Sequence, residues 1–497
     1  MTTLLKYRYH LLGAVVFALM LSRTLNGVWS SDFWEHSAVV RELATNPLHP
    51  HHPQLLLDAP HAFFSPYLMG VALATRLTGL SPIQALSVAG MLNLLLFLVG
   101  LWLFLSVLPV EDLPTTAFYA LLFVLLLIGP EPPTTSGFFH LRYLGIGLPY
   151  PSTFATGLSF VAAYCYARAL RDGRLRWFGV TLLLAVIIIL THSLTFIFLG
   201  CAMVALTLGA KGLRWMDFAK LGMLFALTVG LAALWPYFPF LKLMLGESRV
   251  YDASNYGIYL QRVSLAITLL GVPFLILRLK RNWRDPLVIL FALLSGIYAF
   301  GYLTQHWSYG RVAAGIVLVL DTALASAAAG FEMRLSKRSS ATLDRWLFAG
   351  AVLLFCAAFS YKTVLTPALR EARPGYPDTY SRHEFLSVYT DQYDVILSDV
   401  DTSWPVPTFG GKIVATRHPV AFVPDQATRL ADLEHFFSKN AEVASRWEII
   451  RRYHADFLLF SKNRTPDWEA IAQPFLEAGK QVYEDDRFVL IELPSAP

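Results

Sequence analysis

The sequence predicts a polytopic α-helical membrane protein with about eleven spans and a C-terminal soluble α/β domain. Of its 497 residues, 55% are hydrophobic and only 15% are charged, and the mean hydropathy is +0.50. Ordinary soluble domains carry about 25% charged residues. The charges are also divided unevenly: residues 366–497 hold 20 acids and 14 bases, whereas residues 1–365 hold 15 acids and 26 bases. A soluble enzyme and a disordered chain are therefore excluded.

The spans are predicted from apolar runs, because a helix needs about 20 apolar residues to cross a bilayer. The first run lacks a small-residue cleavage site, so we expect an anchor and not a cleaved signal peptide. The stretch 177–210 is too long for one span and short for two, and we divide it at His192. The runs are 8–28, 83–108, 115–130, 152–170, 177–191, 192–210, 219–241, 259–278, 286–304, 309–330 and 345–365.

The orientation is predicted from Lys and Arg in the short loops, which favour the cytoplasmic side. If the apolar segment 62–79 does not cross, 17 bases gather on one side, in clusters at 6–8, 168–176, 211–220, 278–284 and 334–345. If it does cross, most of these clusters face outward. We therefore expect 62–79 to lie on or dip into the outer face. The N-terminus is then cytoplasmic in a plasma (inner) membrane protein, and 29–82 and 366–497 are both extracytoplasmic.

The C-terminal part, 366–497, alternates short apolar strands with amphipathic stretches. Segments 394–398, 457–461 and 488–491 are typical of buried strands, and 431–437 and 442–453 of helices. We thus divide the chain into a membrane domain, 1–365, and an extracytoplasmic α/β domain. The sequence pI of 8.9 averages a basic membrane part with an acidic tail, so nucleic-acid binding has no support.

An acidic cluster follows the first span directly: Asp32-Phe33-Trp34-Glu35-His36. A carboxylate near the lipid head groups could deprotonate an incoming hydroxyl or amine, with Glu35 or His36 orienting it or holding a metal. The competing interpretation, favoured from the local pattern alone, is a capping box in which Asp32 and Glu35 begin an interfacial helix.

A divalent-cation site is a second hypothesis for this outer loop. The loop holds five of the 13 His in the chain, close to three acids. Prolines interrupt the stretch and no helical His spacing sets a ligand geometry, so a polar loop near the head groups is the favoured alternative. The residues concerned are His36, His49, His51, His52 and His61, with Asp32, Glu35 and Asp58.

Three arginines lie in or beside outward-facing loops: Arg142, Arg249 and Arg311. A guanidinium binds phosphate bidentately, and Arg311, at the outer end of a span, is the favoured phosphate ligand. The alternative for Arg311 is snorkelling to the interface. Within the spans, Asp321 is a functional candidate by position or a packing residue bonded to a Ser, Thr or Arg. His192 is interpreted as a turn residue.

The pattern resembles the glycosyltransferase C (GT-C) superfamily, and in particular its protein-mannosyltransferase and aminoarabinose-transferase branch. A first span ends in an acidic outer loop, followed by an amphipathic helix and by Phe64-Ser65-Pro66-Tyr67-Leu68…Leu77-Thr78-Gly79-Leu80-Ser81. This last segment is similar to the "PPLYY…lfG.S" juxtamembrane motif. The acidic pair is spaced as Asp32…Glu35 instead of adjacent, Ser65-Pro66 replaces Pro-Pro, and the WWDxG motif of oligosaccharyltransferases is absent.

The resemblance implies inverting transfer of a sugar from a polyprenyl-phosphate donor to a glycan, lipid or protein acceptor on the outer face. It implies Asp32 as the general base, and Arg311, with Arg249 or Arg142, as the donor-phosphate ligands. Loop 242–258, with Tyr251 and Asp252, would close over the site, and we add His140 to these acceptor or lid residues. The C-terminal domain would select the acceptor, with 399–404 suited to sugar binding.

Two other classes remain as alternatives. A transporter or flippase of a lipid-linked saccharide usually shows paired repeats and mid-membrane polar residues, and here only Asp321 argues for it. A non-catalytic partner in polysaccharide assembly would use the tail as a binding module. Replacing Asp32 distinguishes both from an enzyme.

Overall fold

The protein is described by a computed structural model that covers residues 2–494 apart from 211, 261–264, 336–340 and 466. Most of the chain is helical (69%), with a small sheet near the C-terminus. It divides into two compact units. Unit 1 comprises residues 1–28, 87–235 and 251–377, and unit 2 comprises 29–86, 236–250 and 378–497.

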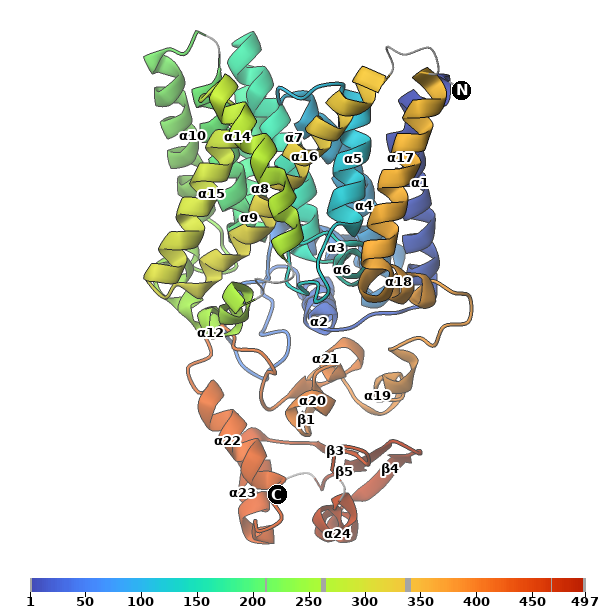
Figure 1. Cartoon of the computed structure of the whole chain (residues 1–497). Coiled ribbons are helices and arrows are strands. Elements are labelled where there is room, and N and C mark those ends of the chain that lie inside the picture. The colour runs from blue at the N-terminus through green and yellow to red at the C-terminus, as the bar shows by residue number, and fades with distance from the viewer. Residues whose placement is uncertain (1, 211, 261–264, 336–340, 466, 495–497) are drawn as a thin grey trace. The chain divides into compact units, whose positions relative to one another are not determined.

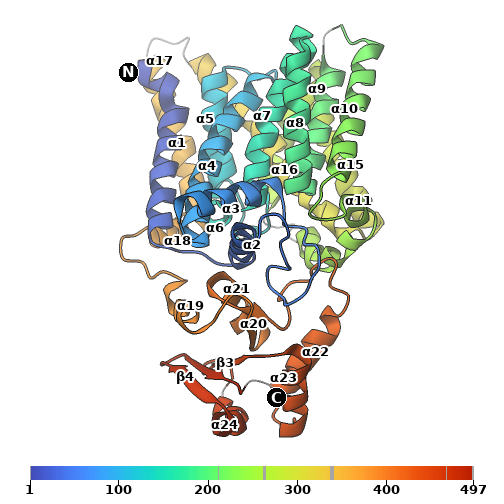
Figure 2. The same cartoon turned by 180° about the vertical axis from the view of Figure 1, so that it is seen from behind.

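Unit 1 is a bundle of long apolar helices that run side by side (Figures 1 and 2). Shorter helices connect them: α6 (Leu141–Gly147), α12 (Asp252–Asn255) and α18 (Thr366–Glu371). The long helices are α1 (Thr2–Leu25), α4 (Pro82–Ser106, whose first turn belongs to unit 2), α5 (Leu113–Leu126), α7 (Pro151–Asp172), α8 (Leu175–Thr191), α9 (Ser193–Gly209), α10 (Trp215–Ala233), α14 (Val272–Arg281), α15 (Pro286–Leu303), α16 (Ala313–Leu335) and α17 (Ala341–Ser360).

These helices fall on the apolar runs of the sequence. Among the described residues, five helical stretches are long and apolar enough to cross a membrane, and α5, α8 and α9 are shorter apolar helices. The chain is accordingly a multi-pass membrane protein. Residues 261–264 of the predicted 259–278 span lie outside the described residues, and 266–271 form a 3-10 turn before α14. The five stretches are Pro82–Ser106, Trp215–Ala233, Pro286–Leu303, Trp307–Leu335 and Thr342–Glu371.

The predicted division of 177–210 at His192 is confirmed. His192 adopts an extended conformation between α8 and α9, and its side chain accepts a hydrogen bond from the backbone N–H of Thr195. The ring nitrogen thus replaces the missing acceptor at the first turn of α9, which is the role of an N-cap.

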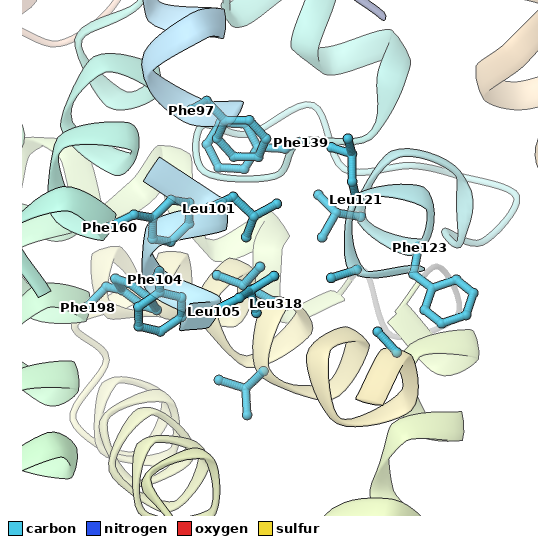
Figure 3. Packing of buried hydrophobic residues seen from close by; sticks show 14 of the residues in the cluster. Phe97, Leu101, Phe104, Leu105, Leu121, Phe123, Phe139, Phe160, Phe198 and Leu318 are labelled. Carbon is cyan, nitrogen blue, oxygen red and sulfur yellow. The ribbon is translucent and has the colours of Figure 1, made fainter. Parts of the chain in front are cut away.

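Aromatic side chains fill the centre of unit 1 (Figure 3). The rings of Phe97 and Phe139 lie 4.6 Å apart, and those of Phe104 and Phe160 lie 5.3 Å apart. Helices α4 and α7 come close because Gly100 faces Gly157: a Cβ at Gly100 would lie 2.6 Å from the Gly157 carbonyl oxygen. Small residues at such crossings are what lets membrane helices pack in van der Waals contact.

Unit 2 joins the outer loop to the C-terminal domain. The loop supplies α2 (Phe33–Thr45) and α3 (Pro66–Thr78), and 236–250 supply α11 (Phe240–Leu245) and most of the 3-10 turn η1 (Glu247–Tyr251). Helix α3 has 13 residues, or about 20 Å at 1.5 Å per residue, against about 30 Å for a bilayer core. Helix α3 is not among the five stretches that are long and apolar enough to cross a membrane, and the placement of 62–79 on the outer face stays a prediction.

The tail is an α/β domain, as predicted, and its predicted strands and helices are all present. Its helices are η6 (Ser381–His383), α19 (Leu386–Tyr389), α20 (Val400–Ser403), α21 (Val406–Phe409), α22 (Gln426–Phe436), α23 (Val443–Tyr453) and α24 (Trp468–Ala478). Its strands are β1 (Val395–Leu397), β2 (Lys412–Ile413), β3 (Phe457–Ser461), β4 (Lys480–Glu484) and β5 (Phe488–Glu492).

The strand order is β2-β1-β3-β5-β4, with β1 parallel to both neighbours and β5 antiparallel to β3 and β4. Side chains alternate along β3, so Leu458 and Phe460 pack with α22, α23 and α24, whereas Phe457 and Leu459 pack on the other face. Leu55 of the outer loop lies in that second cluster and forms a parallel bridge with Ile413. The outer loop thus packs against the face of the sheet that carries Phe457 and Leu459.

Candidate functional site

The acidic cluster lies at the start of α2, and the predicted capping box is not formed. Asp32 occupies the N-cap position with φ −59° and ψ −4°, and its side chain makes no capping hydrogen bond. An N-cap side chain reaches the first N–H groups of a helix from an extended backbone. The helical backbone of Asp32 points the carboxylate elsewhere, so this part of the favoured local interpretation is wrong.

Glu35 turns toward the C-terminal domain, where it meets His418 and Trp404. Its Oε1 accepts hydrogen bonds from His418 Nδ1 at 2.8 Å and from Trp404 Nε1 at 3.2 Å. Asp32 Oδ1 lies 3.7 Å from the same His418 nitrogen. The Glu35 side chain is 8% exposed, whereas those of His418 and Asp32 are 42% and 44% exposed. The buried carboxylate of Glu35 therefore orients the half-exposed imidazole of His418. That imidazole lies beside the half-exposed carboxylate of Asp32.

The electrostatics of this cluster favour retention of a proton on the Glu35–His418 pair. Burial raises the pKa of Glu35, opposed by the hydrogen bonds from His418 and Trp404. The hydrogen bond to Glu35 raises the pKa of His418. Burial opposes this rise, and the negative charges of Glu35 and Asp32 add to it. His418 thus carries its positive charge to a higher pH than an isolated histidine. Asp32 has a nearby cation and access to solvent, as a base acting on a bound hydroxyl needs.

Sequence reasoning did not identify His418. It is 383 residues from Glu35, in a short polar stretch after β2 with no recognisable motif. The predicted partner, His36, is buried and packs against Phe63: the two ring centroids lie 5.1 Å apart, and burial lowers the pKa of His36 to about 4.

Two histidines of the outer loop accept hydrogen bonds from the backbone of its turns. His52 Nδ1 accepts from the backbone N–H groups of Gln54 and Leu55, and His61 Nδ1 accepts from that of Phe63. Burial lowers the pKa of both, in the case of His61 to about 3. Among the described residues, no group of three or more His, Cys, Asp or Glu side chains is arranged to hold a metal ion. Asp32, Glu35 and His36 are therefore not seen as one ligand set, and a divalent cation held by them stays a prediction.

Unit 1 contains a cavity between α5, α7, α9 and α16. Arg311 lines it, and its Nε donates to Asn255 Oδ1 at 2.7 Å while Nη1 donates to Ser136 Oγ. These bonds fix the plane of the guanidinium. Most of the lining is apolar, including Phe139, Phe160, Phe198, Val312 and Leu318.

Asp321 lines the same cavity, together with His140, His192 and Thr195. It is 1% exposed, and neither carboxylate oxygen has a hydrogen-bond partner among the described residues. Among the described residues, the structure thus shows no bond from Asp321 to a neighbouring Ser, Thr or Arg. A buried carboxylate without a partner is costly, which keeps Asp321 as a functional candidate.

The other predicted residues divide between the units. Asp252 in unit 1 accepts from the backbone N–H of Ser308 at 2.9 Å, and Tyr251 precedes it at the start of α12. His140 caps α6: its Nδ1 accepts from the Tyr143 N–H and its Nε2 bonds the Pro133 carbonyl. Arg142 is half-buried on α6, and Arg249 is exposed in unit 2. Asp32, Glu35, His36 and Arg249 thus belong to unit 2, and the remainder to unit 1.

No family model and no curated protein sequence matches the chain. Three solved structures match nearly all of it at low identity. The apo ArnT from Cupriavidus metallidurans aligns over 97% of this chain and 96% of its own, with 12% identity and a TM-score of 0.54. The apo Archaeoglobus fulgidus oligosaccharyltransferase aligns over 94% of this chain and 71% of its own, with 10% identity and a TM-score of 0.54. The mycobacterial arabinofuranosyltransferase AftD aligns over 98% of this chain and 40% of its own, with 15% identity and a TM-score of 0.60.

These matches span both the helical bundle and the C-terminal domain, and all three proteins are glycosyltransferases of the superfamily that the outer-loop motifs resemble. The chain therefore has the fold of the GT-C membrane glycosyltransferases.

Proposed function

We propose that the protein is an inverting glycosyltransferase that moves a sugar from a polyprenyl-phosphate donor to a hydroxyl-bearing or amine-bearing acceptor on the outer face of the membrane. The observation that carries the proposal is the placement of Asp32 beside His418, with Glu35 orienting the imidazole. The fold supports it, since ArnT from Cupriavidus metallidurans has also been solved with undecaprenyl phosphate and the Archaeoglobus fulgidus enzyme with a tethered acceptor peptide.

In the proposed reaction, Asp32 accepts the proton of the acceptor group as its oxygen or nitrogen attacks the anomeric carbon of the sugar. The bond from that carbon to the phosphate oxygen breaks, and its electron pair leaves with the polyprenyl phosphate. Attack from the side opposite the leaving group inverts the anomeric centre. His418 is a positioning residue in this scheme, because its Nδ1 lies 3.7 Å from Asp32 Oδ1 and is held there by the hydrogen bond to Glu35.

Arg311 is the proposed ligand of the donor phosphate, because its guanidinium is already held in one plane and lines a cavity whose other walls are mostly apolar. Charge-assisted bonds from Arg strengthen as negative charge develops on a leaving phosphate. Arg249 and Arg142 remain candidates for the same role. Asp252 holds the turn around Tyr251 to the start of η4 (Trp307–Val312) through Ser308, so we keep both as acceptor or lid residues, with His140.

The test is transfer of a radiolabelled sugar from polyprenyl phosphate by membranes carrying Asp32→Asn or Asp32→Ala. Asp58→Asn, an exposed acid of the same loop, is the matched control. We expect both Asp32 variants to lose transfer while accumulating normally, and Asp58→Asn to retain it. A parallel arm with chelator distinguishes a base from a metal ligand. Full activity of Asp32→Asn would remove the proposed base.

Asp321 supports a second candidate, a transporter of a lipid-linked saccharide, because it places an unpartnered carboxylate inside the bundle. Transport would need Asp321 but not Asp32. Movement of a fluorescent lipid-linked saccharide across proteoliposomes carrying each variant separates the two functions.

A further inference from the structure

A cluster of bases and aromatic rings lies at the end of unit 1 where α7 ends and α8 and α10 begin. The guanidinium carbons of Arg168 and Arg176 lie 5.5 and 5.4 Å from the centroid of the Trp177 ring. The ammonium of Lys220, on α10, lies 5.5 Å from the centroid of the adjacent Phe178 ring. Helices α8 and α10 pack together, so bases from three helices meet at one pair of neighbouring rings.

We propose that this surface binds the head group of an anionic phospholipid of the surrounding membrane, with the acyl chains lying along the outer faces of α8 and α10. The inference does not rest on the proposed transferase function, because none of the residues that carry it belongs to the candidate functional site.

Three bases of this surface have no acidic partner among the described residues. Asp172 pairs with two neighbouring arginines, whereas Arg174, Arg176 and Lys220 form no ion pair in the described part of the chain. Arg174 and Arg176 are exposed and Lys220 is half-buried, so a ligand outside the bundle can reach all three. Unpaired bases beside membrane helices attract anionic head groups, and the rings hold Arg176 and Lys220 in place through cation–π contacts.

On α8, Arg176 stands at the head of an exposed apolar stripe. Gly179, Val180 and Leu183 follow it at spacings of three, four and seven residues, which place them on one face of a helix. Val180 and Leu183 are 40% and 61% exposed. A Cβ at Gly179 would meet no atom within 4 Å, so the surface one turn below Arg176 is open.

Helix α10 repeats the arrangement below Lys220. Met223, Leu227 and Leu231 follow Lys220 at spacings of three, seven and eleven residues and are all exposed. Both helices begin at the same end of unit 1 (Figure 2), so the two stripes run from their bases in the same direction. A base at the membrane surface followed by apolar side chains matches a phospholipid, in which acyl chains follow a phosphate. A soluble anion would leave both stripes unused.

The test is binding of palmitoyl-oleoyl phosphatidylglycerol to the purified full chain in detergent, followed by native mass spectrometry. Phosphatidylcholine with the same acyl chains is the comparison without net charge. The variant Arg176→Gln/Lys220→Gln removes the two bases held against the rings. The matched control is Lys280→Gln/Arg281→Gln, which removes two exposed bases at the end of α14. The loop after α14 contacts the C-terminal end of α9 through Arg284, so the control bases lie at the same end of unit 1.

We expect phosphatidylglycerol to bind more tightly than phosphatidylcholine and to lose about 20-fold in affinity in Arg176→Gln/Lys220→Gln, the effect of two bases at an anionic lipid surface. The control should change the affinity by less than about threefold, because only local charge is read at a site. Arg176→Lys/Lys220→Arg should keep the binding, which separates loss of charge from loss of folding.

Two further arms distinguish a lipid from a soluble phosphate. Dihexanoyl phosphatidylglycerol should bind more weakly than the long-chain lipid, because it covers less of the two stripes, and glycerol 3-phosphate should not compete. Equal affinity for the two long-chain lipids, equal losses in the two Gln double variants, or displacement by glycerol 3-phosphate would each overturn the proposal.

Discussion

Glu42 on α2 and Lys412 on β2 form an ion pair of 2.8 Å across 370 residues of sequence, with side chains that are 1% and 2% exposed. Lys412 Nζ also donates to the carbonyl of His52 at 2.9 Å. Glu42 accepts in addition from the N–H of His51 and from Asn46 and Gln392. The outer loop and the tail are therefore held together by a fully bonded pair of buried charges.

Removing one partner of this pair should destabilise unit 2 strongly. Lys412→Met leaves Glu42 buried without its cation, and such losses cost about 3–5 kcal/mol. We expect a lower Tm in detergent and faster proteolysis of the tail, with partial recovery in Glu42→Gln/Lys412→Met. The exposed Lys480→Met is the control. Equal Tm values for Lys412→Met and Lys480→Met would contradict the argument.

Stability should fall as pH rises through the titration of His418. The pKa of His418 is raised in the folded protein, so the folded state binds more protons than the unfolded state above about pH 6.5. Its contribution is fully present below that pH and is lost as pH rises through the folded pKa. The raised pKa of Glu35 acts in the same direction. Tm should drop more between pH 6 and 9 in wild type than in His418→Gln, and parallel curves would refute this.

Asp321→Leu should raise thermal stability. The substitution removes a buried carboxylate without a hydrogen-bond partner, whose burial costs free energy, while filling a similar volume. Leu318→Met, which lines the same cavity three residues earlier, controls for altered packing. Tm and transfer are measured on the same preparations. Unchanged transfer in a stabilised Asp321→Leu would show that the carboxylate has no role in transfer.

Arg311→Gln should lower kcat/KM for the donor by about 10- to 100-fold, as expected for losing a charge-assisted contact of about 1.5–3 kcal/mol. Arg311→Lys should recover only part, because an ammonium cannot reproduce the planar fork that bonds Asn255 and Ser136. The exposed Arg281→Gln serves as the control. Donor kinetics in Arg311→Lys equal to wild type would argue for a role as a simple point charge.

The sequence alone determined the features that depend on neighbouring residues. Apolar runs predicted the helices, and three residues predicted the turn at His192. Strands such as 457–461 were visible as short apolar segments. These features are readable because burial and backbone preference act over one or two turns of the chain. The likeness to GT-C glycosyltransferases was also readable from the motifs of the outer loop, even though no curated protein sequence and no family model matches.

Only the tertiary structure decided how the site is built. The local pattern at Asp32 and Glu35 favoured a capping box, but Glu35 instead accepts from His418, 383 residues away, and Asp32 takes a helical backbone that cannot cap. Glu42 and Lys412, 370 residues apart, likewise meet as a buried ion pair only in the folded protein. Such pairings follow from which buried surfaces meet when the chain folds, and no periodicity within a single segment encodes them.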